Sequence, residues 1–111
     1  MKLNKITKKD AMELLNNKVQ FIGSYINVDY IQVAKSLFIN FNENVIPYLE
    51  RTETRKCVKQ MYTQIKFKRE NGEYIYFSQI INSRFYKLII DDKTFVIIEG
   101  CDGFTTCFHI I

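Results

Sequence analysis

The first apolar repeat of the chain predicts a helix over residues 8–15. Ala11, Leu14 and Leu15 recur at spacings of three and four, so they share one helix face. Thr7 precedes them, and its hydroxyl can accept a hydrogen bond from a first-turn amide. The pattern is typical of a short, capped amphipathic helix.

The next segment changes from alternation to helical spacing. Residues 19–25 alternate apolar with polar side chains, which is typical of a strand. From residue 31 to residue 41 apolar side chains recur every three or four positions, and Asn27 or Asp29 can cap the helix that this predicts. We expect this second helix to pack on a sheet.

The sequence pattern around residues 53–62 fits both the helical period and the strand period of two. On a helical wheel Arg55, Lys56 and Lys59 lie on one half and apolar side chains on the other, which favours a helix. Alternating apolar side chains from residue 61 to residue 67 also fit a strand, so both interpretations stay open. Residues 42–49, which contain Pro47, are left without an assignment.

The C-terminal half reads as strands separated by short turns. The expected strands span residues 65–69, 73–77, 84–90, 95–99 and 104–111, with turn signals at residues 70–72, 91–94 and 100–103. Strands joined by such short turns are antiparallel neighbours. We therefore expect an α+β fold with two or three helices on one face of an antiparallel sheet of about five strands. Its last four strands should form a meander from Ile65 to Ile111.

Length and composition are those of a globular protein. The 111 residues fit a single domain, 1–111, and the chain is 47% hydrophobic and 25% charged, unlike a disordered one. The first ten residues are charged but lack the apolar region of a signal peptide, and the three cysteines are an odd number. These features predict a cytoplasmic protein.

Basic charge is concentrated in one segment. Seven of the sixteen Lys and Arg residues lie between residues 51 and 69 against one acid, Glu53, which gives this segment a formal charge of +6. Such a segment attracts phosphates or an acidic protein surface, and nearby aromatic side chains suit either partner. A merely solvated face is the third interpretation. The candidate contact residues are Arg51, Arg55, Lys56, Lys59, Tyr62, Lys66, Lys68, Arg69, Tyr74 and Tyr76.

Cys57, Cys101, Cys107 and His109 contain the ligand types of a zinc site. Structural zinc ligands usually come in pairs two to four residues apart, and this spacing is absent here. We therefore expect no metal and no cofactor.

Cys107 and His109 also suggest a catalytic dyad, because residues two apart in a strand project from the same face. The opposite face of this strand is more apolar, so we expect the face with Cys107 and His109 to be solvated. No oxyanion donor or orienting group is identifiable in the sequence. A catalytic role is therefore not expected.

The leading hypothesis is a small non-enzymatic interaction module that binds a protein or ribonucleoprotein through the basic segment. The whole chain contains sixteen Ile, nine Asn and two Ala, and this composition suggests an AT-rich bacterial, phage or mobile-element genome. An anti-CRISPR-like inhibitor of a host nuclease is one concrete version. The alternatives are a direct nucleic-acid-binding protein and a cysteine- or metal-dependent enzyme.

The C-terminal strand suggests a mode of assembly. Phe104 to Ile111 contains neither Lys nor Pro, the residues that discourage pairing at a sheet edge. At the end of a meander this strand would be such an edge. We expect a homodimer or a partner that docks there by strand addition.

Overall fold

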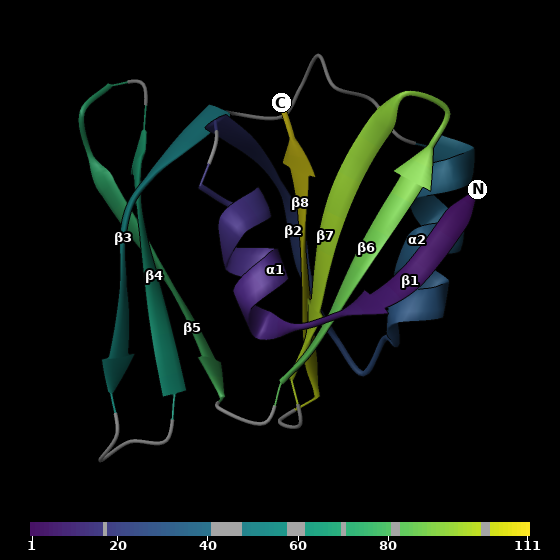
Figure 1. The fold of residues 1–111 in the computed structure, drawn as a ribbon, viewed down its shortest axis with the longest axis horizontal. Helices are drawn as coiled ribbons and strands as arrows, with labels where there is room; N and C mark the ends of the chain where they lie inside the picture. The colour runs from purple at the N-terminus through teal and green to yellow at the C-terminus, as the bar shows by residue number, and fades with distance from the viewer. Residues whose placement is uncertain (17, 41–47, 58–61, 70, 81–82, 101–102) are drawn as a thin grey trace.

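Two helices and one antiparallel sheet of eight strands make up the described part of the chain (Figure 1). The computed structural model describes residues 1–16, 18–40, 48–57, 62–69, 71–80, 83–100 and 103–111. Along 48–57, 62–66 and 75–80 it describes the backbone and the strand register. The expected α+β class and antiparallel sheet are confirmed, and the sheet has more strands than the five expected.

The strands follow the order β1-β6-β7-β8-β2-β3-β4-β5 across the sheet. The helices are α1 (Lys8–Leu14) and α2 (Tyr30–Asn40). The strands are β1 (Lys2–Ile6), β2 (Lys18–Ile26), β3 (Tyr48–Cys57), β4 (Tyr62–Arg69), β5 (Tyr74–Ile80), β6 (Arg84–Ile90), β7 (Lys93–Glu99) and β8 (Phe104–Ile110).

Both predicted helices begin at the caps that the sequence indicates. The Thr7 hydroxyl accepts a hydrogen bond from the Asp10 amide at 3.1 Å. At the start of α2, the Gln32 amide donates to Asp29 Oδ1 at 2.8 Å, and the Asp29 amide donates to Gln32 Oε1 at 3.1 Å. This reciprocal pair is a capping box, which satisfies two amides that have no partner inside a helix.

The two helices lie on opposite faces of the sheet, so the expectation that all helices share one face was wrong. Ala11 of α1 belongs to the same core cluster as Val96 of β7, and Ala34 of α2 belongs to the other core cluster with Phe95 of the same strand. Adjacent residues of a strand point to opposite faces, which places α1 and α2 on different sides. Figure 1 shows the same arrangement. The continuous apolar run of β7 provides side chains for both faces.

Residues 53–57 form part of strand β3, so the prediction that favoured a helix over residues 53–62 was wrong. β3 pairs with β2 on one side and with β4 on the other, from Leu49 opposite Arg69 to Cys57 opposite Tyr62. β2 pairs only with residues 48–50, whereas every residue from 53 to 57 pairs with β4, and this pairing outweighs the helical charge segregation of the ten-residue window. A register shift between Arg51 and Glu53 also interrupts the period of two that a strand would show. Residues 58–61 lie outside the described part.

The hairpin predicted around residues 70–72 is confirmed. β4 and β5 pair from Tyr62 opposite Ile80 to Lys68 opposite Tyr74. Gly72 has a φ of 90°, and its amide donates to the Arg69 carbonyl at 3.0 Å. Glycine adopts this left-handed conformation without steric cost, which explains the turn.

The predicted C-terminal meander is confirmed in part, because the C-terminal half is largely meander-like but is interrupted between β5 and β6. β6, β7 and β8 are consecutive neighbours, and β4 pairs with β5, but β5 and β6 lie far apart in the strand order. Strand β8 lies between β7 and β2, so the predicted edge at residues 104–111 was wrong. The described sheet ends instead at β1, which the sequence did not predict, and at β5.

Candidate functional site

Strand alternation divides the predicted contact residues between two faces of β3–β5. Phe67 is fully buried in the core beside α1, and its neighbour Lys68 is exposed, so the two mark different faces. Register then assigns the other positions, because directly opposed residues share a face. The positions that share a face with Lys68 are Arg55, Tyr62, Lys66, Tyr74 and Tyr76, and we call these six together the Lys–Tyr face. The positions that share a face with Phe67 are Arg51, Lys56 and Arg69.

The Lys–Tyr face therefore collects six of the ten predicted contact positions. Its backbone places Lys68 directly opposite Tyr74, and Lys66 directly opposite Tyr76. Lys68 is exposed, and Tyr74 has 51% of its surface accessible. Lys59, the tenth predicted position, lies outside the described residues. Plain alternation along β3 would place Arg51 and Arg55 on one face, but the register shift between Arg51 and Glu53 places them on different faces.

Acidic residues of β3 lie opposite the lysines of β4. Glu50 is the register partner of Lys68, and Glu53 is the register partner of Lys66. Oppositely charged residues that face each other across two strands attract and partly offset each other's field. The formal +6 of residues 51–69 already counts Glu53, but it omits Glu50 and includes the three basic positions of the other face, so it overstates the charge of the Lys–Tyr face.

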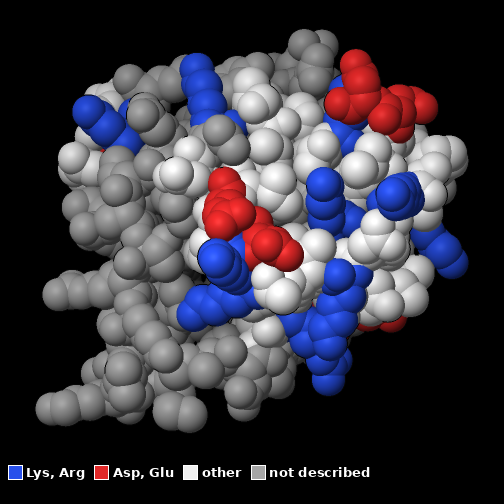
Figure 2. All heavy atoms as spheres, in the orientation of Figure 1, with Lys and Arg blue, Asp and Glu red and all other residues white. Residues whose placement is uncertain are grey.

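Charges on the described part of the view in Figure 2 are mixed. Blue Lys and Arg side chains are distributed in separate groups, and red Asp and Glu side chains lie among them (Figure 2). A mixed distribution is typical of a solvated surface rather than of a phosphate-binding stripe. This view of the described residues therefore adds no further basic site.

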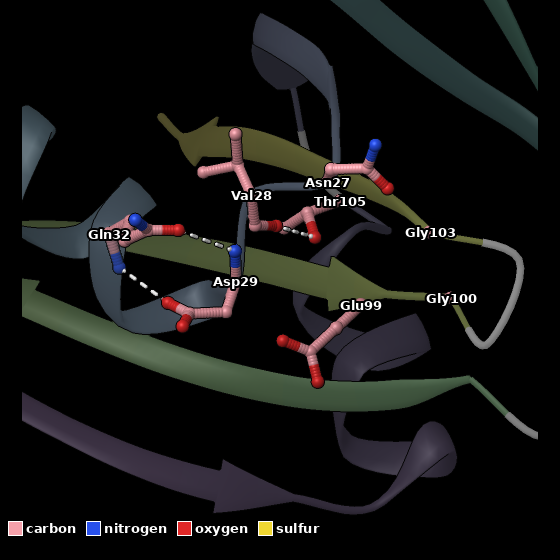
Figure 3. A pocket seen from close by; sticks show the side chains of 8 residues that line it. All are labelled: Asn27, Val28, Asp29, Gln32, Glu99, Gly100, Gly103 and Thr105. Carbon is pink, nitrogen blue, oxygen red and sulfur yellow. Dashed lines mark hydrogen bonds between the residues drawn. The ribbon is translucent and has the colours of Figure 1, made fainter.

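A pocket of about 310 Å³ lies at the start of α2 (Figure 3). Two of its polar side chains already have hydrogen-bond partners: the Thr105 hydroxyl donates to the Val28 carbonyl at 2.6 Å, and Glu99 Oε2 accepts from the Tyr30 amide at 3.0 Å. Glu99 Oε1 also lies 3.3 Å from Arg84 Nη1. These contacts cap the helix and fix it to β7 and β8. The lining residues are Asn27, Val28, Asp29, Gln32, Glu99, Gly100, Gly103 and Thr105.

The C-terminal strand does not present Cys107 and His109 to solvent, so the expected solvated face was wrong. Cys107 is fully buried, and His109 has 6% of its surface accessible. His109 Nδ1 lies 2.6 Å from Gln20 Oε1, and its ring lies 4.9 Å from the Phe95 ring. Both faces of β8 are buried because helices cover both sides of the sheet.

Burial also determines the chemistry of this thiol. It raises the pKa of Cys107 far above its ordinary value, so the thiol stays protonated at neutral pH. A protonated, inaccessible thiol is a poor nucleophile and a poor metal ligand. Among the residues that the structure describes, no group of three or more His, Cys, Asp or Glu side chains is arranged to hold a metal ion. Cys101 lies outside them.

Comparison with known proteins does not assign a family. The chain matches no protein-family model, no curated protein and no solved structure. No helix of the described residues is long and apolar enough to cross a membrane. The function must therefore be inferred from the residues and their arrangement.

Proposed function

We propose that this chain is a non-enzymatic binding module that contacts a protein, alone or within a ribonucleoprotein, through the Lys–Tyr face. One observation carries the proposal: β4 and β5 place Lys68 opposite Tyr74 and Lys66 opposite Tyr76. Tyrosine buries a large area at low cost in conformational entropy, and an adjacent cation attracts a carboxylate. Two such pairs side by side suit a partner surface with acidic and apolar groups.

A protein partner is favoured over nucleic acid by the acids on β3. Phosphate backbones bind through cations whose charge is not already compensated. Here Glu50 and Glu53 lie opposite Lys68 and Lys66 in the register. A protein surface tolerates such mixed charge, because its own acids and bases can be arranged to match. One concrete form of the proposal is an anti-CRISPR-like inhibitor encoded by a phage or mobile element.

The test compares two variants of equal charge change on different surfaces. A double variant, Lys68→Glu with Tyr74→Ser, alters the Lys–Tyr face, and Lys35→Glu alters an exposed position on α2. The partner is first identified by co-purification from the native host after nuclease treatment, and its affinity is then measured by calorimetry. We expect the double variant to bind about tenfold more weakly or worse, and Lys35→Glu to bind normally.

Two results would contradict the proposal. Equal binding by the wild type and the double variant would remove the Lys–Tyr face from the interface. Binding to a plain oligonucleotide, with a salt slope of about 0.7 to 0.9 per neutralised phosphate and a clear loss in the double variant, would instead support direct nucleic-acid binding.

A further inference from the structure

The two edges of the described sheet differ in charge. β1 forms one edge and carries Lys2 and Lys5 in its five residues. β5 forms the other edge, and its sequence from Tyr74 to Ile80 contains no charged residue and no proline. Lysine and proline are the usual means by which proteins prevent an edge strand from pairing. Of the two terminal strands of the described sheet, β5 is therefore the one that is open to pairing.

The backbone direction at this edge follows from the hairpin. The Arg69 amide donates to the Glu73 carbonyl at 2.7 Å, so Glu73 directs its carbonyl toward β4. In an antiparallel pair this direction alternates along the strand. Tyr76, Ser78 and Ile80 therefore direct their amides and carbonyls away from β4, toward the open edge.

We propose that β5 pairs antiparallel with β5 of a second copy of this chain, about a two-fold axis at Phe77. In this register Tyr76 lies opposite Ser78 of the second copy, and the two Phe77 residues lie opposite each other. The outward amides and carbonyls of residues 76 and 78 then bond across the axis, as an antiparallel ladder requires. Aromatic residues opposite each other stabilise such a pair. The result is one continuous sheet through both copies.

A second copy fits this edge because β5 brings no charge to it. The nearest lysines are one strand away, and Lys66 and Lys68 lie opposite Glu53 and Glu50. Self-pairing at β5 therefore places no uncompensated like charges directly opposite each other. Self-pairing at β1 would bring lysines of both copies together, which is unfavourable.

The proposed dimer would place two Lys–Tyr faces on one continuous sheet. An isologous interface relates the two copies by the same two-fold axis, so both faces would lie on the same side near that axis. A partner with two acidic segments could then engage both at once. The proposed dimer itself does not depend on the partner, and it can be tested on the isolated chain.

The first experiment measures mass against concentration. Light scattering coupled to size exclusion should give twice the 13.2 kDa of one chain at high concentration. Ser78→Lys places two lysines diagonally across the proposed axis, and we expect it to weaken the dimer about tenfold or more. Ser36→Lys adds the same charge on exposed α2 and should leave the dimer intact. A wild type that stays monomeric at high concentration would overturn the proposal.

A second measurement locates the interface if a dimer forms. Amides of Tyr76, Ser78 and Ile80 should exchange hydrogen more slowly at high than at low protein concentration, and the Phe77 amide should not change. The exposed Phe38 of α2 offers the competing interface, because 60% of its surface is accessible. A dimer that survives Ser78→Lys but is lost in Phe38→Lys would overturn the proposal.

Discussion

Two parts of the sheet, the strands β7 and β8 and the hairpin of β4 and β5, differ in how far their residues are buried. In β7 and β8 nearly every central residue is buried, from Phe95 to Ile98 and from Thr105 to His109. At the end of β4, Phe67 is buried, and Lys68 and Arg69 are exposed. Helices on both faces cover the first pair of strands. The hairpin of β4 and β5 has one face that joins the core and one that carries the proposed contact residues.

This difference is visible in the sequence of each strand. Residues 95–98 are all apolar, which is what a strand buried on both faces requires. Residues 65–68 alternate Ile, Lys, Phe and Lys, which is typical of a strand with one solvated face. The first pattern indicates a structural role, and the second leaves side chains available for a partner. Four predictions test how far this contrast extends.

The largest effect is expected in the core where the two regions meet. The Phe108 ring of β8 lies 5.3 Å from the Phe67 ring of β4 and 5.8 Å from the Phe21 ring of β2. Phe108→Ala leaves a cavity among these rings, so we expect the free energy of unfolding to fall by about 3 to 5 kcal/mol. Urea denaturation measures the loss. A loss below about 1 kcal/mol would mean that β8 is not the packed centre of the sheet.

The next effect concerns the buried polar pair of β2 and β8. Gln20 is fully buried and its Oε1 lies 2.6 Å from His109 Nδ1. Gln20→Ala leaves the ring nitrogen without this partner, and we expect a loss of about 1 to 3 kcal/mol. A double-mutant cycle with His109→Phe separates the hydrogen bond from the packing. Additive losses in the cycle would contradict a specific coupling between the two side chains.

The third effect depends on pH and on the buried thiol. Burial raises the pKa of Cys107 well above its ordinary value of 9.0. Above that value the unfolded thiol loses its proton and the folded one keeps it, so the unfolded state binds fewer protons. Stability then falls as pH rises, by up to about 1.4 kcal/mol per pH unit.

Cys107→Ala provides the control for this slope. The other titratable groups are the same in the wild type and the variant. The difference between the unfolding free energies of the two proteins therefore reports the ionisation of the Cys107 thiol. We expect the difference to shrink as pH rises above the ordinary thiol pKa, in urea denaturation under reducing conditions. A constant difference would show that the thiol ionises in the folded state as it does in the unfolded one.

Local features of the fold could be predicted from the sequence because each depends on neighbouring residues. The caps at Thr7 and Asp29 and the turn at Gly72 each reflect contacts within a few positions. The alternation around Phe67 likewise identified a hairpin strand. These predictions were confirmed because local hydrogen bonds and allowed backbone angles decide them.

Features that depend on distant pairing could not be predicted in this way. β1 has only Leu3 and Ile6 as apolar residues, so its short segment shows no clear period, and pairing with β6 makes it a strand. The position of β8 between β7 and β2 depends on pairs that lie far apart in sequence. The prediction that His109 is solvated was wrong for the same reason, because tertiary packing of α2 buries that face of the sheet.

The smallest effect is expected on the Lys–Tyr face, and it is the sharpest test of the contrast. Lys68 is exposed and Tyr74 is half exposed, so their substitution removes little buried surface. The double variant Lys68→Glu with Tyr74→Ser should change the free energy of unfolding by about 0.5 kcal/mol or less, since exposed positions usually tolerate change. The like-charge contact that it creates with Glu50 opposite adds only a small surface cost. Urea denaturation beside Phe108→Ala gives both values under the same conditions. A loss of about 3 kcal/mol or more would place these side chains among the structural ones, and the distinction between a packed region and a contact region would not hold.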